Sequence, residues 1–221
     1  MISTVVQWCF GEGRIAIDAP EFSPTGNHLK IEGRVIASLM PDWLGATWKR
    51  DMPQLAGKLK LMPLPAWEPG GLRTSVHGGT MIAIPKSSPN FDEAWAFVKH
   101  LYLSDELAEQ LYKQNCIITP VRRLWDSDFF KEPDPYFHGQ ARGSLYIEQA
   151  PYVPTRTSSP FRTLAMSRIG EAVNDLRQYA QARGEYGVDA LLPEARRLLR
   201  EAEDRIRVEM SRNVFLSGAT P

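Results

Sequence analysis

The chain has 221 residues, of which 43% are apolar and 24% are charged, and these fractions are ordinary for a globular protein. Its 26 basic residues are balanced by 26 acidic residues. A nucleic-acid-binding protein usually carries an excess of basic residues that neutralises phosphates, so this balance argues against a DNA or RNA partner.

The first part of the chain is interpreted as short strands separated by turns. Apolar and β-branched residues between turn-forming residues are typical of strands. Proline cannot donate to a strand ladder, so Pro63 and Pro65 end one of these strands. Gly78 and Gly79 lie in the last strand, where glycine permits close backbone approach and unusual dihedral angles. The expected strands are residues 5–10, 13–19, 31–40, 57–65 and 77–85, with a loop over 21–28 and a turn with a short helix over 41–53.

Two capped helices are expected next. Asn90 stands at the N-cap of the first, with Glu93 three residues later, close to a capping box. Ser104 caps the second, and Asp105 and Glu106 follow where the helix dipole favours acidic residues. Apolar residues at helical spacing predict the buried side of each helix. These are Phe91, Ala94, Trp95, Val98, Leu101 and Tyr102 in the first, and Leu107, Ala108, Leu111 and Tyr112 in the second.

The last part of the chain is predicted to be irregular and then helical. Residues 125–160 are rich in Pro, Gly and aromatic residues, so we expect irregular structure with short helical turns near 127–130. Pro160 predicts the start of a long helix and Gly184 its end. The final helix is expected to begin around Pro193. The predicted buried faces are Ile169, Val173, Leu176 and Ala180, and then Ala195, Leu198, Leu199, Ala202, Ile206 and Met210.

Aromatic residues at turns are the main candidates for ligand contact. The chain has six tryptophans, which is many for its length. Trp43 and Trp67 each follow a proline turn directly after a strand end, where a flat ring could stack against the apolar face of a sugar. The alternative is that these rings bury large areas in the core. Phe161 and Arg162 open the long helix, whose free N–H groups suit ligand oxygens; the alternative is a hydrophobic staple and a surface charge.

No catalytic, metal or cofactor site is predicted. The sequence has neither a phosphate-binding glycine motif nor a nucleophile elbow. Among the four histidines, which lack metal-ligand spacing, only His77 is placed near a pocket, beside the glycine pair; the alternative is a role in the turn. Cys9 and Cys116 form no metal-binding cluster, and a disulfide between them stays open. No apolar run is long enough to span a membrane, and a signal peptide is not expected at the start.

The order of the elements from Glu32 to about Asn213 resembles that of bacterial extracellular solute-binding proteins, the sugar-capturing receptors of ABC importers. The segment GRVIASLMPDWLGATWK precedes LKLMPLPAW, and GGTMIAIPKSSPN then leads into FDEAWAFVKHLYLSDELAEQL. The turn ITPV, a Pro-rich passage and two terminal helices complete the order. The most specific signature is the Gly-Gly strand, the turn at Lys86-Ser87-Ser88 and the helix that contains Ala94-Trp95. The similarity is to the C-terminal half of these receptors.

The resemblance implies an α/β fold of the type II periplasmic-binding-protein kind, with two lobes joined by hinge strands. The fold is expected to be incomplete here, with most of the N-terminal lobe missing. Residues 1–76 and 122–221 would be C-terminal-lobe-like, and residues 77–121 would belong to the N-terminal lobe. By similarity to maltose-binding and related receptors, Trp43 lies where a stacking aromatic is expected. The implied ligand-binding residues are Trp43, Trp67, Gly78, Gly79, Phe161 and Arg162.

The function implied is carbohydrate binding in an interlobe cleft without catalysis or cofactor, followed by delivery to an ABC permease in the membrane. The resemblance implies a periplasmic location, or an extracellular one with a membrane anchor. Two alternatives stay open. A carbohydrate-active hydrolase predicts a positioned carboxylate pair in the cleft. A truncated, non-binding interaction module predicts self-association through the surface left by the missing lobe.

Overall fold

The computed structural model describes residues 1–155 and 159–213, which divide into two compact units. One unit consists of residues 1–19 and the described residues from 159 onward, and the other consists of Pro20–Thr155. The predicted division of the chain between family lobes stays a prediction, and residues 156–158 and 214–221 of its last segment lie outside the described residues.

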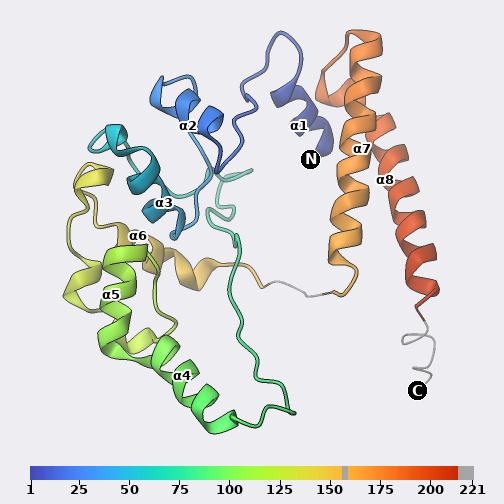
Figure 1. Cartoon of the computed structure of the whole chain (residues 1–221). Coiled ribbons are helices and arrows are strands. Elements are labelled where there is room, and N and C mark those ends of the chain that lie inside the picture. Colours follow the sequence, from blue (N-terminus) through green and yellow to red (C-terminus); the bar gives the residue numbers. More distant parts are fainter. Residues whose placement is uncertain (156–158, 214–221) are drawn as a thin grey trace. The chain divides into compact units, whose positions relative to one another are not determined.

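The first unit is built from the helices α1 (Ile2–Cys9), α7 (Arg162–Arg183) and α8 (Val188–Ser211). Figure 1 shows α7 and α8 side by side, with the short α1 next to the end of the pair at which the chain turns. Burial of apolar side chains between the three helices stabilises the unit. Its core contains Ile2, Val6, Ala172, Leu176, Ala180, Leu191, Ala195 and Leu198.

The strand predicted over residues 5–10 is wrong, because α1 covers most of it. Val5 and Val6 are β-branched and favour strands by local propensity. Ile2 and Val6, however, share one helix face and pack into the core with α7 and α8. Packing within the unit therefore decides the conformation against a weak local preference.

The boundaries of α7 and α8 are partly those predicted. Gly184 ends α7 with a φ of 66°, a left-handed conformation that glycine adopts without steric cost. The expected start of α8 at Pro193 is wrong, because the helix begins at Val188 and contains Pro193. The helix loses one backbone hydrogen bond at the proline. Burial is confirmed for Leu176, Ala180, Ala195, Leu198 and Ala202, whereas Ile169, Leu199 and Met210 are exposed.

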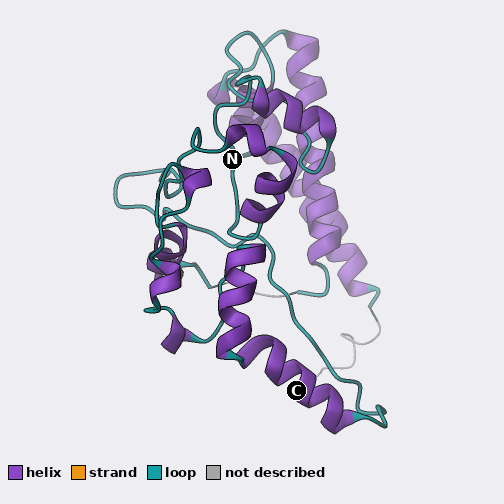
Figure 2. Ribbon diagram, turned by 60° about the vertical axis from the view of Figure 1, so that its left-hand side comes forward, coloured by secondary structure: helices purple, strands orange, loops and turns teal. Residues whose placement is uncertain are grey.

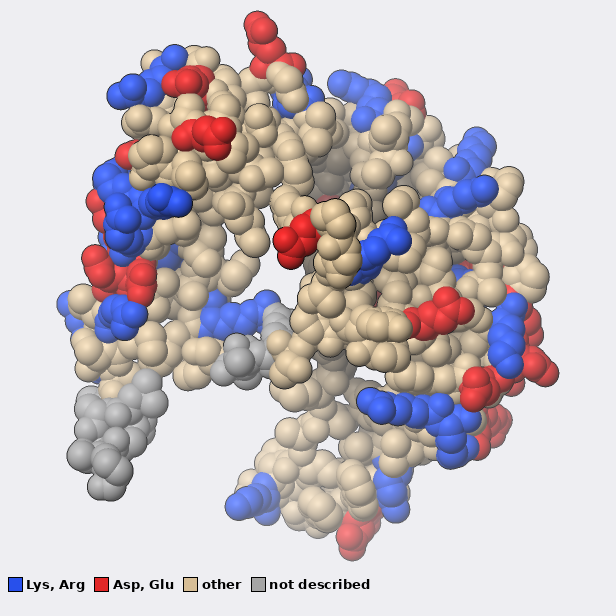
Figure 3. Space-filling model, turned by 180° about the vertical axis from the view of Figure 1, so that it is seen from behind, with Lys and Arg blue, Asp and Glu red and all other residues tan. Residues whose placement is uncertain are grey.

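The outer surface of this unit carries charges of both signs. Arg197 pairs with Glu194 and Glu201 on α8, and Arg207 pairs with Glu203 one turn away. Figure 3 shows basic and acidic groups interspersed over the helices of this unit. Such mixed pairs indicate a solvated helix face and contribute little individually to stability.

The second unit contains more helices than the sequence predicts. The short helix after residue 41, the two helices that follow Asn90 and Ser104 and the turn near residues 127–130 are confirmed. Ser104 caps its helix as predicted, but the predicted capping by Asn90 is wrong, because its side chain makes no capping hydrogen bond. The helices are α2 (Pro24–Ile31), α3 (Leu44–Asp51), α4 (Phe91–Leu103), α5 (Asp105–Asn115) and α6 (Arg142–Gln149), with 3-10 turns at Pro53–Leu55, Arg122–Leu124, Asp128–Phe130, Pro135–Phe137 and Ala150–Tyr152. The expected loop over 21–28 is wrong: Ser23 caps α2 by accepting a hydrogen bond from Gly26 N, and Pro24 occupies its first turn.

The predicted α/β type II periplasmic-binding-protein fold is contradicted. None of the described residues forms a β-strand, and Figure 2 shows helices joined by loops. A single isolated bridge pairs Asp134 with Gln140 in the described part of the chain. The remaining segments expected as strands are largely extended or irregular, but they do not pair into ladders. Since a strand is stabilised only when a neighbour satisfies its N–H and C=O groups, apolar patterning alone does not produce a sheet.

Leu61 illustrates what replaces the ladder. Its N–H donates to Oε1 of Gln140 at 2.6 Å, and Nε2 of Gln140 donates to the Leu61 carbonyl at 2.9 Å. Further along the same segment, Leu64 N donates to the carbonyl of Arg73 at 2.8 Å. Side chains and isolated backbone hydrogen bonds thus satisfy individual N–H and C=O groups of this extended segment. In a sheet, a neighbouring strand would satisfy these groups along the whole segment.

Two packed regions hold the second unit together. In the first, the side chains of Leu44, Trp48, Met52, Leu55, Tyr136 and Phe137 form a core around α3. The Tyr136 hydroxyl lies 3.0 Å from the carbonyl oxygens of both Trp48 and Met52, so it ties the 3-10 turn at Pro135–Phe137 to the end of α3.

In the second region, a buried arginine joins three helices. Arg142 is 1% exposed, donates to the carbonyl of Cys116 at 3.2 Å and lies 4.5 Å from the ring centroid of Tyr112. Its Nε is 3.4 Å from Oδ2 of Asp134, which also accepts from Lys49 Nζ at 2.7 Å. Removing one partner of such a buried set leaves an uncompensated charge, so these contacts depend on one another.

The helix α4 packs less than the sequence predicts. None of its residues is buried, and Figure 1 shows it extending from α5. The predicted burial is wrong for Phe91 and Trp95, which are 52% and 45% exposed, and Phe97 is exposed as well. The apolar residues that indicated an amphipathic helix are present, but the described residues of the unit do not cover them.

Candidate functional site

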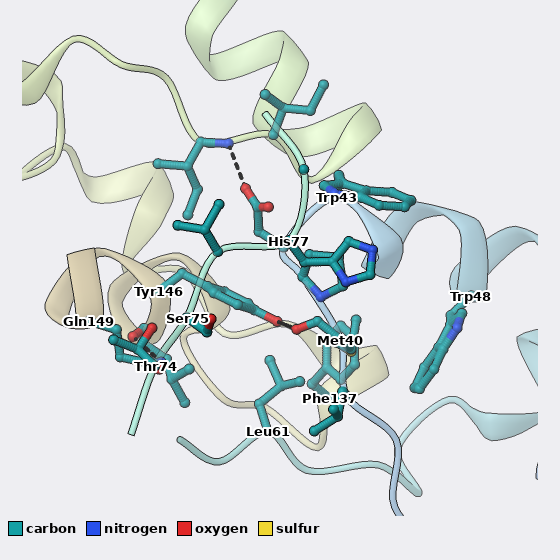
Figure 4. A pocket seen from close by; sticks show the side chains of 18 of the residues that line it. Met40, Trp43, Trp48, Leu61, Thr74, Ser75, His77, Phe137, Tyr146 and Gln149 are labelled. Carbon is teal, nitrogen blue, oxygen red and sulfur yellow. Dashed lines mark hydrogen bonds between the residues drawn. The ribbon is translucent and has the colours of Figure 1, made fainter. Parts of the chain in front are cut away.

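A broad hollow of about 1370 Å³ opens in the second unit. Its lining includes residues 35–43, the extended segment 74–80, residues 117–120, parts of the segment 55–64 and parts of α4, α5 and α6. Figure 4 shows Trp43, His77 and Tyr146 around it. Typical small-molecule pockets enclose about 300–1,000 Å³. The hollow therefore has room for a ligand of several rings.

Trp43 is held at this site by two ring contacts. It directly precedes α3, and its ring is parallel to that of Phe22, with centroids 6.0 Å apart and an interplanar angle of 5°. The His77 ring approaches edge-on, with centroids 6.3 Å apart, as Figure 4 shows. A Cβ atom added at Gly78 would lie 3.6 Å from the indole Nε1. These contacts hold the indole in one plane beside the hollow.

The segment 74–80 brings hydrogen-bonding groups to the hollow. Thr74 and Ser75 line it, and their side chains make no hydrogen bond to other described residues. Gly78 and Gly79 have φ values of 99° and 120°, which side-chain-bearing residues rarely adopt. The backbone therefore turns beside Trp43 in a way that requires glycine and leaves polar groups available to a ligand.

The opposite wall is fixed by hydrogen bonds between distant segments. The Tyr146 hydroxyl on α6 donates to the carbonyl of Met40 at 3.1 Å, drawn as a dashed line in Figure 4. Asp42 accepts from the backbone N–H of Ile118 at 3.4 Å. Burial raises the pKa of Tyr146 above its ordinary value, because desolvation disfavours the phenolate. The hydroxyl therefore remains a neutral donor that joins the two walls.

Two buried nitrogen donors lie in the wall near α2 and α3. Lys30 Nζ is 2.9 Å from Oε1 of Glu21, an ion pair without hydrogen-bond geometry, and 5.6 Å from the ring centroid of Trp48. The Trp48 Nε1 has no hydrogen-bond partner among the described residues. Both atoms are shielded from solvent, although their residues belong to the lining of the hollow.

The structure brings some of the predicted site residues together and separates others. Trp43, Gly78 and Gly79 line the hollow. Trp67 is 71% exposed and lies outside the lining. Phe161 and Arg162 belong to the first unit, at the start of α7. The ligand-binding role of all these residues stays a prediction.

Sequence reasoning missed Phe22 and Tyr146. Phe22 lies directly before Ser23 and Pro24, a pair typical of a helix start, but that signal predicts α2 and not a contact of Phe22 with Trp43. Tyr146 lies on α6, in a segment interpreted as irregular because it is rich in Pro, Gly and aromatic residues. Neither residue stood beside a glycine pair or a proline-tryptophan turn, the features on which the prediction relied.

The chemistry of the lining is that of a binding surface. Asp42 is the only carboxylate among the described residues that line the hollow, and its Oδ2 already accepts a backbone hydrogen bond. The described residues contain no cluster of three His, Cys, Asp or Glu side chains suited to a metal ion. Within the same residues, no helix combines the length and apolar character needed to cross a membrane.

Comparison with known proteins identifies part of the chain. Residues 26–107 match the family model of the bacterial extracellular solute-binding proteins. The predicted resemblance to this family is confirmed. The matched segment includes most of α2, all of α3 and α4, Trp43 and the glycine pair, and so contains all of the hollow's lining between residues 30 and 80.

Two relatives of the matched segment are solute-binding proteins of the same kind. An arabinooligosaccharide-binding protein of Halalkalibacterium halodurans is 31% identical over 48% of this chain and 24% of its own length. An arabinooligosaccharide-binding protein of Bacillus subtilis is 34% identical over 52% of this chain and 28% of its own length. The match thus spans about a quarter of each relative. The family and both relatives are binding proteins and not enzymes, and no solved structure gives a significant match.

Proposed function

We propose that this chain contributes to the substrate-binding component of a bacterial ABC importer and binds a carbohydrate in the hollow beside Trp43. The match of residues 26–107 to solute-binding proteins carries this proposal, because that segment supplies Trp43 and the glycine pair. The relatives that share it are named for binding arabinose oligosaccharides. Arabinose oligosaccharides are therefore the first ligands to test.

The lining supports carbohydrate as the ligand class. A sugar ring presents an apolar face and a rim of hydroxyl groups. The Trp43 indole offers a flat apolar surface, and Thr74 and Ser75 offer hydroxyls that make no other hydrogen bond within the described residues. Such binding needs no chemistry and no cofactor. We place the ligand in this hollow in place of the interlobe cleft that the resemblance implied.

The cellular role follows from the same proposal. A receptor of this family is expected outside the cytoplasm, in the periplasm or anchored at the cell surface. Its partner would be the membrane permease, which receives the ligand-bound form. The hydrolase alternative gains no support from the hollow, because Asp42 stands alone there among the described residues and glycoside hydrolysis uses two carboxylates.

Isothermal titration calorimetry of the whole chain against a sugar panel tests the proposal. The panel contains arabinose, arabinose oligosaccharides, maltose oligosaccharides and an acyclic polyol. Saturable binding of at least one cyclic sugar supports the proposal. Absence of heat with every sugar, from protein that unfolds cooperatively, contradicts it.

Self-association is a second candidate function, favoured by the exposed apolar side chains of α4. Phe91, Trp95 and Phe97 leave much of their area in water. Soluble monomers rarely expose large contiguous apolar patches, and those that do often use them to bind a protein. A second copy of the chain would cover these side chains in the way that the self-association alternative predicts.

A further inference from the structure

The loop of residues 20–23 holds an aromatic ring against Trp43 at a cost in backbone energy. Phe22 is 64% exposed, yet its ring lies parallel to the indole at a centroid distance of 6.0 Å. Its φ is 60°, in the left-handed region. A bulky residue there is a genuine outlier and is strained. An exposed phenylalanine gains little from burial, so something other than core packing accounts for this conformation.

Three contacts fix the loop in place. The Ser23 hydroxyl donates to the carbonyl of Pro20 at 2.8 Å and accepts from Gly26 N at 3.0 Å. Glu21 pairs with the buried Lys30 of α2 at 2.9 Å. The residues on either side of Phe22 are therefore anchored to α2. The Phe22 ring itself stacks against Trp43.

The two sides of Trp43 differ in what they meet. Phe22 is absent from the residues that line the hollow, whereas Trp43, His77 and Gly78 are among them. Phe22 thus contacts the indole from outside the lining, whereas His77 and Gly78 contact Trp43 from within it. Parallel aromatic rings attract one another beyond the area that they bury. The contact limits the rotation of the indole.

We propose that Phe22 is a positioning residue for ligand binding: it holds the Trp43 indole in the plane on which a cyclic sugar stacks. This inference rests on the proposed function, because it assigns a role within the same site. A ring fixed in advance loses less conformational freedom when the ligand arrives, so preorganisation by Phe22 increases the affinity.

Phe22→Gly tests the inference cleanly. Glycine adopts φ values near 60° without steric cost, so the loop keeps its conformation while the ring is lost. We expect the affinity for the sugar to fall about 3- to 10-fold, the range expected for one aromatic pair. Phe22→Tyr retains the ring and should bind like the parent protein. Phe91→Ala, at another exposed phenylalanine outside the hollow, is the matched control and should also bind like the parent.

A second readout follows the indole without ligand. Fluorine NMR of protein labelled with 5-fluorotryptophan gives one resonance for each tryptophan. The Trp43 resonance is assigned as the one that Trp43→Ala removes. Phe22→Gly should shift and broaden this resonance, and Phe22→Tyr should shift it much less. A purely structural role of Phe22 would lower thermal stability without moving this resonance selectively.

The outcomes separate the two proposals. If the parent and Phe22→Gly bind the sugar equally while Trp43→Ala does not bind, the positioning role is overturned and the binding function stands. If the Trp43 resonance is the same in the parent and Phe22→Gly, the positioning role is overturned whatever the affinity. If the parent binds no sugar although Phe22→Gly moves the resonance, the proposed function fails, and the ligand role of Phe22 fails with it.

Discussion

Gly78 lies so close to Trp43 that a Cβ atom at position 78 would stand 3.6 Å from the indole Nε1. The φ of Gly78 is 99°, so the position combines a backbone that needs glycine with direct contact to the candidate stacking ring. The glycine pair that marked this segment in the sequence is therefore part of the environment of Trp43 and not only a turn.

Gly78→Ala is expected to destabilise the protein by about 1 kcal/mol and to weaken sugar binding, because the methyl group adds strain and occupies space beside Nε1. Gly79→Ala is a matched control, since its φ is 120° and its Cβ would meet no atom within 4 Å. It should cost similar stability with less effect on affinity. Urea denaturation and calorimetric titration measure the two effects. Equal losses of affinity in both variants would show that the indole contact is irrelevant.

Gly143→Ala should destabilise the second unit by at least about 2 kcal/mol, because there is no room for a side chain. The added Cβ would lie 2.7 Å from the Phe130 carbonyl oxygen and 2.8 Å from the Tyr112 hydroxyl. That hydroxyl also accepts the Gly143 N–H at 2.9 Å. Thermal unfolding followed by circular dichroism provides the measurement.

Gly170→Ala is the control for this substitution. Gly170 lies in α7, and a Cβ there would meet nothing within 4 Å. Alanine in place of an exposed helical glycine is expected to stabilise by about 0.5–1 kcal/mol. If Gly143→Ala proved as stable as the parent, the packing described around Arg142 and Tyr112 would be incorrect.

Local signals in the sequence predicted several helix ends correctly. They did not predict structure that depends on pairing or packing between distant segments. Ser104 caps α5 through a hydrogen bond from Leu107 N, and Gly184 ends α7, because both effects depend on the nearest residues. The prediction of a sheet was wrong because a strand depends on hydrogen bonds to a distant partner. The backbone groups of Leu61 bond instead to the side chain of Gln140. The helix α1 was not predicted, because the helices that bury Val6 are α7 and α8, which lie far along the chain.

The candidate site was also predictable only where its residues carry a local signal in the sequence. Trp43 and the glycine pair were found from a local turn and a local dipeptide, and the structure places them on one hollow. Phe22 could not be found in this way, because its significance comes from a left-handed backbone and a ring contact across the unit. Trp67 has the same local signature as Trp43 but no place in the lining, so proline-tryptophan turns alone do not identify a site.

Tyr136→Phe should remove one source of pH-dependent stability. Burial raises the pKa of Tyr136 from 10.0 to about 12, so the folded protein holds the phenolic proton more tightly than the unfolded chain does. The stabilisation is present below pH 10 and is lost as the pH rises from about 10 through about 12. At neutral pH the variant should be less stable by about 1 kcal/mol, because a hydrogen bond to the end of α3 is lost.

Urea denaturation of both proteins from neutral to alkaline pH checks this prediction. The difference in the free energy of unfolding between parent and Tyr136→Phe should shrink as the pH rises above 10. The other tyrosines titrate in both proteins, so their contributions cancel in the difference. A difference independent of pH over this range would contradict the burial described for Tyr136.

Replacing Trp95 and Phe97 by Gln should shift the chain toward the monomer if α4 mediates self-association. Their exposed area gives a second copy an apolar surface to cover, and glutamine keeps the helix while removing that gain. Light scattering after size exclusion, over a wide range of concentration, measures the change. Met166→Gln, at an exposed apolar residue of α7, should leave the association unchanged. A parent chain that is monomeric at every concentration would rule out this role for α4.

The affinity of Trp43→Ala for arabinose oligosaccharides, measured by calorimetry beside the parent and Trp67→Ala, tests the central claim most directly. Loss of a stacking platform typically weakens binding by about 1 kcal/mol or more, roughly fivefold or greater. We predict that the parent and Trp67→Ala bind with the same affinity and that Trp43→Ala binds at least fivefold more weakly. Equal binding by all three proteins would contradict the claim that the sugar is held beside Trp43.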